Sequence, residues 1–275
     1  MTDNPSPDAR DEAFWHEFLT RGDSRERRAR LVLRRLPSGP RCRLCAAPFA
    51  GPGSVLMRPI GKRRSEQNPT MCRSCFEFVA DHHGGAEIEC TMLFADIRGS
   101  TTLAEGQSAA GFRALLDRFY TVATGVVFDH DGTVDKFVGD ELVALFFPLL
   151  SGDRHALKGI SAAHALLLAT GHADPGGPWV PIGAGVHTAE TWFGAVGHGG
   201  RVELTAVGDP MNTTARLASV SRAGEVLVTT AAATAAGLDP TLERRTLDLK
   251  GKRQATEVLV LRATDAPPDS SQATR

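Results

Sequence analysis

Two acidic residues stand where carboxylates could bind divalent cations. Asp96 follows a predicted apolar strand over residues 89–95 and precedes a glycine-containing loop, and Asp140 lies at the predicted tip of a hairpin. Carboxylates at the ends of adjacent strands can converge on Mg²⁺, which prefers carboxylate and phosphate oxygens at about 2.1 Å. Two such ions can activate an attacking hydroxyl group and hold the phosphate that is displaced. Taken singly, each acid would be interpreted as a residue that caps a turn.

Four of the five cysteines form two CxxC pairs. They are Cys42, Cys45, Cys72 and Cys75, and 26 residues separate the two pairs. Each pair can supply one side of a tetrahedral metal site, and two pairs complete a closed Zn²⁺ site with Zn–S bonds of about 2.3 Å. The spacing predicts one structural zinc ion. Bound iron and a redox-active or metal-free state are the alternatives.

The residues around these cysteines agree with a metal site. Arginines adjoin both pairs and would favour the thiolate forms electrostatically. His82 and His83 are possible substitute ligands, although they are less well placed. The fifth cysteine, Cys90, lies on the strand that leads to Asp96 and is predicted to be a small buried side chain.

The residues around the two acids resemble the class III adenylyl/guanylyl cyclase family. Three phrases match family motifs in order and at suitable separations: Phe-Ala-Asp-Ile-Arg-Gly-Ser-Thr, Lys-Phe-Val-Gly-Asp-Glu and Val-Gly-Asp-Pro-Met-Asn-Thr-Thr-Ala-Arg-Leu. The resemblance covers residues 86–262. It implies a nucleotidyl cyclase, which converts a nucleoside triphosphate into a 3′,5′-cyclic monophosphate and pyrophosphate.

The resemblance implies roles for the matched positions that bind metal and base. Asp96 and Asp140 correspond to the acids that hold two Mg²⁺ or Mn²⁺ ions, and the backbone near Ile97 also contacts metal. Lys136, four positions before the second acid, corresponds to a lysine that contacts the base. Thr205, three positions before Gly208, falls where the family places its second base-reading residue.

Three more matched positions serve the ribose and the phosphates. Asn212 corresponds to the asparagine that orients the ribose, Arg216 to the arginine that stabilises the transition state, and Lys250 to the lysine that binds the terminal phosphates. The reaction needs such groups because charge on the phosphoryl oxygens and on the departing pyrophosphate requires fixed positive partners. Asn212 and Arg216 are four residues apart and therefore share one face of a helix.

In this family, the two halves of one active site come from different protomers. The metal-binding acids of one chain meet the base-, ribose- and phosphate-contacting residues of the other, and two-fold symmetry repeats the site. Because this chain carries both halves, the resemblance implies a catalytic homodimer.

The identity of the base is less constrained. The Lys136 ammonium can donate to an acceptor on a purine, and the Thr205 hydroxyl can accept from an adenine amino group. The family's guanylyl cyclases usually carry an acid and a small polar residue at these positions. ATP is the predicted substrate, with GTP or a pyrimidine triphosphate as alternatives. Ala189 and Glu190 depart from the family pattern and bear on efficiency more than on reaction type.

Composition favours a globular protein with an uneven distribution of charge. Apolar residues make up 42% and charged residues 23%. Residues 21–75 contain 14 Lys or Arg and three acids, although the whole chain carries a net charge of −1. We expect this basic segment to be a solvated face. An electrostatic surface for nucleic acid, for an acidic partner or for the acidic remainder of the chain is the alternative.

Neither a membrane span nor a signal peptide is expected. The longest apolar runs are far shorter than the roughly 20 residues that cross a bilayer, and residues 1–11 are polar and acidic. We therefore predict a cytoplasmic protein without a membrane partner, in which stable disulfides are uncommon.

Helices and strands must alternate to position these residues. We expect a disordered segment over residues 1–11, a helical region over 12–35 interrupted at Gly22, and a short helix over 76–83. Ser108 is predicted to cap a long helix, and Asp131-Gly132 to form a hairpin turn between a short strand and residues 133–138. The remaining predictions are strands at 142–147, 180–187, 191–196, 202–207, 225–229, 242–250 and 257–261, and helices at 155–170, 210–220 and 231–236.

This order predicts an α+β fold around a ferredoxin-like βαββαβ unit. We divide the chain into a polar tail with an Arg-rich helical segment (1–35), a four-cysteine zinc-binding module (36–85), a cyclase catalytic domain (86–262) and a disordered tail (263–275). The zinc module would be regulatory or scaffolding. A second hypothesis is a zinc-ribbon nucleic-acid-binding protein whose cyclase-like domain only senses nucleotide, which the intact set of matched residues disfavours.

Overall fold

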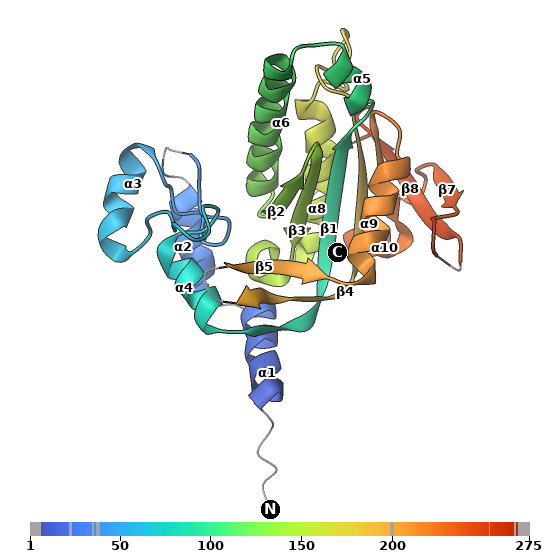
Figure 1. Cartoon of the computed structure of the whole chain (residues 1–275). Coiled ribbons are helices and arrows are strands. Elements are labelled where there is room, and N and C mark those ends of the chain that lie inside the picture. The colour runs from blue at the N-terminus through green and yellow to red at the C-terminus, as the bar shows by residue number, and fades with distance from the viewer. Residues whose placement is uncertain are drawn as a thin grey trace, which may run out of the picture. The chain divides into compact units, whose positions relative to one another are not determined.

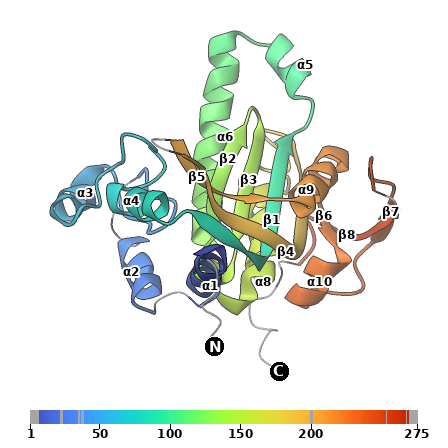
Figure 2. The same ribbon diagram turned by 60° about the horizontal axis from the view of Figure 1, so that its bottom comes forward.

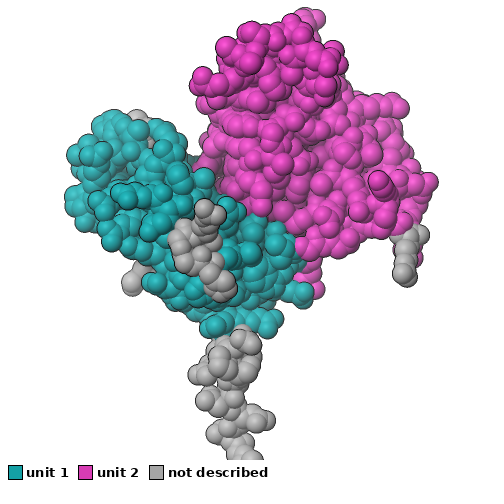
Figure 3. All heavy atoms as spheres, viewed as in Figure 1, with its two compact units in different colours: residues 1–88, 148–150, 191–207 teal, residues 89–147, 151–190, 208–275 magenta. Residues whose placement is uncertain are grey.

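The chain divides into two compact units in a computed structural model that describes residues 7–21, 24–34, 36, 39–198, 201–252, 254–266 and 268. Unit 1 comprises Met1–Ile88, Pro148–Leu150 and Thr191–Val207, and unit 2 comprises Glu89–Phe147, Ser151–Glu190 and Gly208–Arg275 (Figure 3). Unit 1 thus contains a segment, residues 191–207, that lies inside the predicted cyclase domain. The domain boundaries drawn from the sequence stay predictions.

Unit 1 is mainly helical around the cysteine segment. Its helices are α1 (Pro7–Thr20), α2 (Ser24–Arg34), α3 (Gly51–Met57) and α4 (Arg73–Asp81), with a 3₁₀ turn at Arg58–Ile60 (Figure 1). Trp15 of α1 is fully buried, and its indole nitrogen donates to the carbonyl oxygen of His83 at 3.2 Å. Phe18 packs on Phe78 of α4 with ring centroids 4.9 Å apart. Aromatic packing and one hydrogen bond thus join α1 to α4 and to the residues that follow it, without an ion pair between these side chains.

An eight-stranded sheet runs through the chain in the order β2-β3-β1-β4-β6-β8-β7, with β5 paired to β4. The strands are β1 (Gly84–Ile97), β2 (Thr133–Val138), β3 (Glu141–Phe146), β4 (Ile182–His198), β5 (Arg201–Val207), β6 (Glu225–Thr229), β7 (Arg244–Leu247) and β8 (Thr256–Arg262). The helices that follow β1 are α5 (Ser100–Glu105), α6 (Ala109–Asp129), α7 (Pro148–Ser151), α8 (His155–Ala169), α9 (Asp209–Val220) and α10 (Thr230–Ala236).

Helices cover both faces of the unit 2 sheet, as strand alternation shows. Val226 and Val228 of β6 belong to the large core cluster with α6, α8 and α10, whereas Leu227 packs with Leu217 of α9 in a second cluster. Because neighbouring side chains on a strand point to opposite faces, α9 lies on the face opposite to α8 (Figures 1 and 2). The mixed α+β fold was predicted and is confirmed.

Several local predictions are confirmed and others are wrong. Ser108 caps α6 by accepting from the Gly111 backbone N–H at 3.1 Å. The Asp131-Gly132 hairpin turn is wrong, because α6 continues to Asp129 and these residues link it to β2; the Gly132 N–H bonds the Val127 carbonyl at 2.9 Å and closes the helix. The strands predicted at 180–187 and 191–196 form one strand, β4.

The ends of the chain also differ from expectation. Helix α1 begins at Pro7, inside the segment predicted to be disordered. Residues 1–6, Gly22 and most of the predicted C-terminal tail lie outside the described residues. Helix α3 was not predicted, because its seven residues include two glycines and a proline. Among the described helices, none combines the length and apolar character that a bilayer span needs.

Candidate active site and metal centre

Three acids gather where β1 ends and β3 begins. Asp96 pairs in register with Glu141 across the antiparallel β1–β3 ladder, and Asp140 immediately precedes Glu141. Burial and then the nearby Asp140 carboxyl raise the pKa of Asp96 to about 6, although Arg98 opposes this shift. Burial, Asp96 and Asp140 raise the pKa of Glu141 to about 7. We call Asp96, Asp140 and Glu141 the carboxylate site.

The carboxylate site fits divalent cations. Its oxygens come from two strand ends that the sheet holds together, and their mutual repulsion is what a cation of charge +2 would relieve. The backbone N–H of Ile97 also donates to Asp96. Leu93, Ala95 and Ile97 point into the core cluster. Asp96 therefore faces the opposite side of the sheet, the side that carries α9.

The tip of the β2–β3 hairpin is held by α6. Tyr120 stacks on Phe137 with ring centroids 3.9 Å apart, and its hydroxyl donates to the carbonyl oxygen of Gly139. Gly139 has φ of +62°, a left-handed conformation that glycine adopts without strain. Tyr120 thus positions Asp140, the next residue. Sequence reasoning missed this role of Tyr120, because its hydrogen bond joins residues that are 19 positions apart.

Arg98 is a second residue that sequence reasoning missed. Its guanidinium donates to the Asp96 carboxylate and, through Nη1, to the carbonyl oxygen of Ser219 at 2.9 Å. Its backbone N–H donates to the Pro181 carbonyl at 2.8 Å. The sequence offered one signal for this role, because Arg98 follows the predicted metal ligand Asp96 by two residues.

The predicted ribose and transition-state residues share one face of α9. Asn212 is exposed and Arg216 is partly buried. The Arg216 guanidinium lies against the turn after β7, since a Cβ atom at Gly251 would come within 3.2 Å of Nη2. Lys250 in the same turn is exposed, whereas Lys252 pairs with Asp209 in the first turn of α9. Lys252 was not predicted to take part in this arrangement.

The two predicted base-reading residues belong to different units. Lys136 of unit 2 lies on β2, and its ammonium is 3.3 Å from the buried Asp135 carboxylate. Thr205 of unit 1 lies on β5 and is buried. Their roles, and those of Asn212, Arg216 and Lys250, stay predictions.

The four predicted cysteine ligands converge in unit 1. We call Cys42, Cys45, Cys72 and Cys75 the cysteine centre, and their sulfur atoms all lie within 4.8 Å of one another. The Cys45 and Cys72 sulfurs are 3.7 Å apart, which matches the edge of about 3.8 Å in a tetrahedron with Zn–S bonds of about 2.3 Å. The sulfur set therefore fits a zinc ion, and the predicted four-cysteine group is confirmed as a potential metal centre.

Backbone geometry around the cysteine centre turns the ligands inward. Ala46 has φ of +59°, and its N–H donates to the Cys42 carbonyl at 2.9 Å. The Cys72 N–H donates to the Cys42 sulfur at 3.2 Å, a contact that stabilises a thiolate. His82 stacks between Phe14 and Phe78, away from the ligand group found among the described residues.

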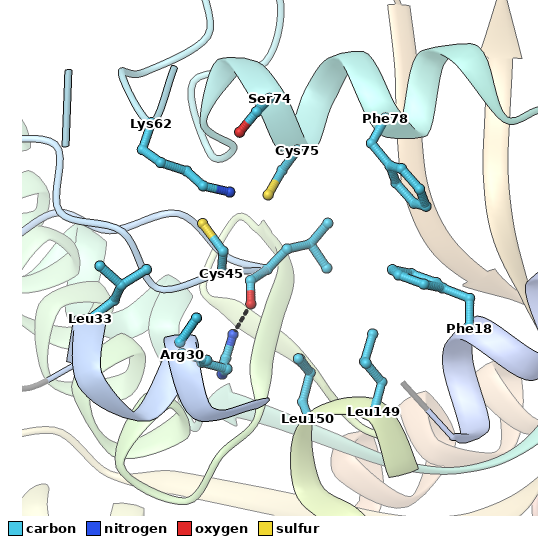
Figure 4. A pocket seen from close by; sticks show the side chains of 12 residues that line it. Phe18, Arg30, Leu33, Cys45, Lys62, Ser74, Cys75, Phe78, Leu149 and Leu150 are labelled. Carbon is cyan, nitrogen blue, oxygen red and sulfur yellow. Dashed lines mark hydrogen bonds between the residues drawn. The ribbon is translucent and has the colours of Figure 1, made fainter. Parts of the chain in front are cut away.

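Lys62 is the cation nearest the cysteine centre in the cavity shown in Figure 4. Cys45 and Cys75 line this cavity of about 270 Å³, and the Lys62 amine points toward them. Burial lowers the pKa of Lys62, but Cys75 and Cys45 outweigh it, so the net shift is upward. A zinc ion bound by four thiolates would carry a net charge of −2, which the Lys62 ammonium would partly offset.

The arginines beside the cysteines bind backbone carbonyls or, for Arg73, a carboxylate. Arg43 is buried and donates to the Leu204 carbonyl at 2.7 Å, while Arg41 donates to the Leu33 carbonyl at 2.8 Å. Arg73 pairs with Glu77. These guanidinium groups are directed to acceptors other than the cysteine sulfurs, and the electrostatic effect expected of them on the thiols stays a prediction.

Residues 85–262 match the adenylate and guanylate cyclase catalytic domain family. The chain belongs to this family. It is 33% identical over 149 residues to adenylate cyclase 1 of Rhizobium meliloti, covering 51% of this chain and 22% of that protein. It is 34% identical over 139 residues to an uncharacterized protein of Mycobacterium tuberculosis, with 50% and 25% covered. The chain thus spans about a quarter of the length of these curated relatives.

Solved cyclase structures resemble the same region. The guanylyl cyclase Cya2 gives a TM-score of 0.60 at 26% identity, covering 64% of this chain and 93% of that one. The adenylyl cyclase CyaB from P. aeruginosa gives 0.56 at 25% identity, with 64% and 95% covered. The cyclase domain contains the carboxylate site, whereas the cysteine centre precedes the matched residues.

Proposed function

We propose that the chain is a homodimeric adenylyl cyclase that converts ATP into 3′,5′-cyclic AMP and pyrophosphate. The observation that carries this proposal is the convergence of Asp96 and Asp140, which lie 44 positions apart in sequence, at one end of the sheet. Membership of the cyclase family supplies the reaction type. The relatives include both adenylyl and guanylyl cyclases, so ATP rests on the chain's own residues.

Asp96 and Asp140, with the backbone at Ile97, would hold two Mg²⁺ or Mn²⁺ ions that activate the 3′-hydroxyl and neutralise phosphate charge. Tyr120 keeps Asp140 in place through the hairpin tip. The remaining residues act from α9 and its neighbouring turn. Arg216 would stabilise charge on the α-phosphoryl group, and Asn212 would orient the ribose for in-line attack.

Lys250, Lys136 and Thr205 complete the proposed substrate site. Because Lys250 is exposed, its ammonium group would be able to contact the terminal phosphates of a bound nucleotide. Lys136 and Thr205 would contact the adenine, with Thr205 accepting from its amino group. GTP or a pyrimidine triphosphate would require a different donor and acceptor pattern at these two positions. A partner chain supplies the second half of each site in this proposal.

Product analysis tests the proposal directly. Purified protein is incubated separately with ATP, GTP, CTP and UTP plus Mn²⁺, and products are identified by mass spectrometry. We expect cyclic AMP from wild type and from Asp117→Ala, a control acid whose side chain is 59% exposed on α6. Asp140→Ala should form none. Cyclic GMP or a cyclic pyrimidine nucleotide as the main product would overturn the ATP assignment, and no cyclic product from any substrate would overturn the activity.

We further propose that the cysteine centre holds one structural Zn²⁺ and that unit 1 regulates or scaffolds a cytoplasmic cyclase. The matching sulfur geometry and the charge-compensating Lys62 support zinc. Arg30 and Arg43 of the basic segment would not contact nucleic acid in the alternative function, because both are 95% buried and donate to backbone carbonyls. Metal analysis of protein purified without added zinc should give about one zinc per chain.

A further inference from the structure

Arg98 joins the carboxylate site to the far end of α9. One terminal nitrogen donates to the Asp96 carboxylate, and the other donates to the carbonyl oxygen of Ser219 at 2.9 Å and of Ser221 at 3.5 Å. Ser219 lies in the last turn of α9, and Ser221 is its C-cap residue. A planar guanidinium with donors on separate nitrogens can serve both acceptors at once, which a lysine ammonium on its flexible stem does less well.

The contact is built into the fold. Asp96 and α9 share one face of the sheet, and the Arg98 backbone is held by the Pro181 carbonyl. The Arg98 side chain is 20% exposed. The last carbonyls of a helix have no partner within the helix and carry partial negative charge. Arg98 therefore supplies hydrogen-bond donors to carbonyl oxygens at the C-terminal end of α9 that have no partner within the helix.

Helix α9 carries Asn212 and Arg216 on its earlier turns. A helix moves as a rigid rod, so a clamp on its final turn also sets the axial position of residues one and two turns earlier. Arg216 is close to that end, since its carbonyl accepts from the Ser219 hydroxyl at 2.8 Å. A change in the position of Asp96 would reach α9 through Arg98.

We propose that Arg98 is a positioning residue that ties Asp96 to α9 and so links the two active sites of the dimer. This inference rests on the proposed function, in which the metal-binding acids and α9 of one chain serve different sites. Arg98 then connects the acid that one site uses to the helix that the other site uses. Cation binding at Asp96 and the placement of Arg216 become coupled within each chain.

A heterodimer separates the two ends of this connection. One chain carries Asp140→Ala and contributes only its α9, and the other carries Arg216→Ala and contributes only its metal-binding acids, so one complete site remains. Arg98→Ala is placed in the α9-contributing chain, where its own Asp96 belongs to the dead site. We expect kcat to fall about tenfold or more, because small misplacements of catalytic groups cost up to about a hundredfold.

The matched controls define the outcomes. Arg113→Ala in the same chain removes an arginine that is 81% exposed and should leave activity unchanged. Arg98→Lys keeps the positive charge but lacks the planar guanidinium with donors on separate nitrogens, so this variant should recover little of the lost activity. Loss of activity only when Arg98→Ala sits in the acid-contributing chain would overturn the proposal, as would full rescue by lysine.

A second measurement needs no activity. Hydrogen exchange of the full-length protein without added Mg²⁺ or Mn²⁺ reports on the last turn of α9, where the Ser221 N–H bonds the Leu217 carbonyl at 3.0 Å. Arg98→Ala should speed exchange over residues 217–221, and Mn²⁺ should change exchange there in wild type but not in the variant. Unchanged exchange in both comparisons would overturn the link. Faster exchange in a protein without cyclase activity would support the link and reject the proposed function.

Discussion

The cysteine centre and the carboxylate site gather ligands in opposite ways. The cysteine centre brings four sulfurs of one chain together, and two of its four cysteines are fully buried. An ion with tetrahedral coordination would therefore be enclosed. The carboxylate site gathers like charges where β1 ends and β3 begins, and burial followed by these neighbouring charges raises the pKa of Asp96 and Glu141. A closed site stabilises the fold that builds it. An open site of like charges costs stability and leaves room for substrate.

Removing one cysteine ligand should produce the largest change. Cys75→Ser takes away one of four thiolates and should abolish zinc retention, because the free energy of zinc binding, about 10 kcal/mol or more, is also folding energy. Zinc content per chain and thermal unfolding followed by tryptophan fluorescence measure the effect. Cys90→Ala is the matched control, since Cys90 is buried outside the centre. Full zinc content in Cys75→Ser would show that the site is not a four-ligand site.

The next prediction tests whether the active site is divided between chains. Asp140→Ala and Arg216→Ala should each be inactive alone. Co-expressed in equal amounts, half of the dimers should be mixed and carry one complete site of two, restoring about a quarter of wild-type activity. Cyclase assays on the mixture provide the measurement. No recovery from mixing correctly folded variants would place the complete site within one chain, like the cysteine centre.

The burial of the carboxylate site and the repulsion within it should appear as pH-dependent stability. Asp96 and Glu141 have raised pKa values of about 6 and about 7, so the folded state binds more protons than the unfolded chain, whose acids titrate near pH 4. Stability without added Mg²⁺ or Mn²⁺ should therefore fall as the pH rises from about 4 to about 7.

A variant that removes the charge of Asp140 gives a second test of the pH-dependent stability. Asp140→Asn should reduce this loss and raise the melting temperature at pH 8 by about 2–4 °C, or about 1 kcal/mol. Thermal unfolding at pH 5 and pH 8 checks both statements. Asp117→Asn on α6 is the control and should show neither effect. A lower melting temperature for Asp140→Asn at pH 8 would mean that this acid stabilises the cation-free fold.

The smallest expected effect concerns the hairpin tip. Tyr120→Phe keeps the stacking on Phe137 and removes the hydrogen bond to Gly139. A neutral hydrogen bond contributes about 1 kcal/mol, so Mn²⁺ affinity and kcat/KM should fall about fivefold. Mn²⁺ titration and steady-state kinetics give the result, with Tyr120→Leu as a stronger disruption of the same contact. Equal activity of all three proteins would remove Tyr120 from the support of Asp140.

The grouping of the four cysteines and family membership could be predicted from residue order. The CxxC spacing places two ligands within one turn of chain, and three separated motifs carry the cyclase resemblance. Strands and helices with regular apolar periodicity, such as α8 and β6, were also found at nearly their observed bounds. These features depend on neighbours along the chain, where backbone geometry limits the possible arrangements.

The tertiary structure alone decided which charges meet. Arg41 and Arg43, which adjoin Cys42, donate to backbone carbonyls, whereas Lys62, which lies 10 positions before Cys72, points toward the sulfurs. Arg98 found its second acceptor 121 positions away on α9. A long side chain can bind any acceptor that folding brings within a few ångströms of it. Which acceptors lie that close follows from the order of strands in the sheet and from helix packing, and not from position in the sequence.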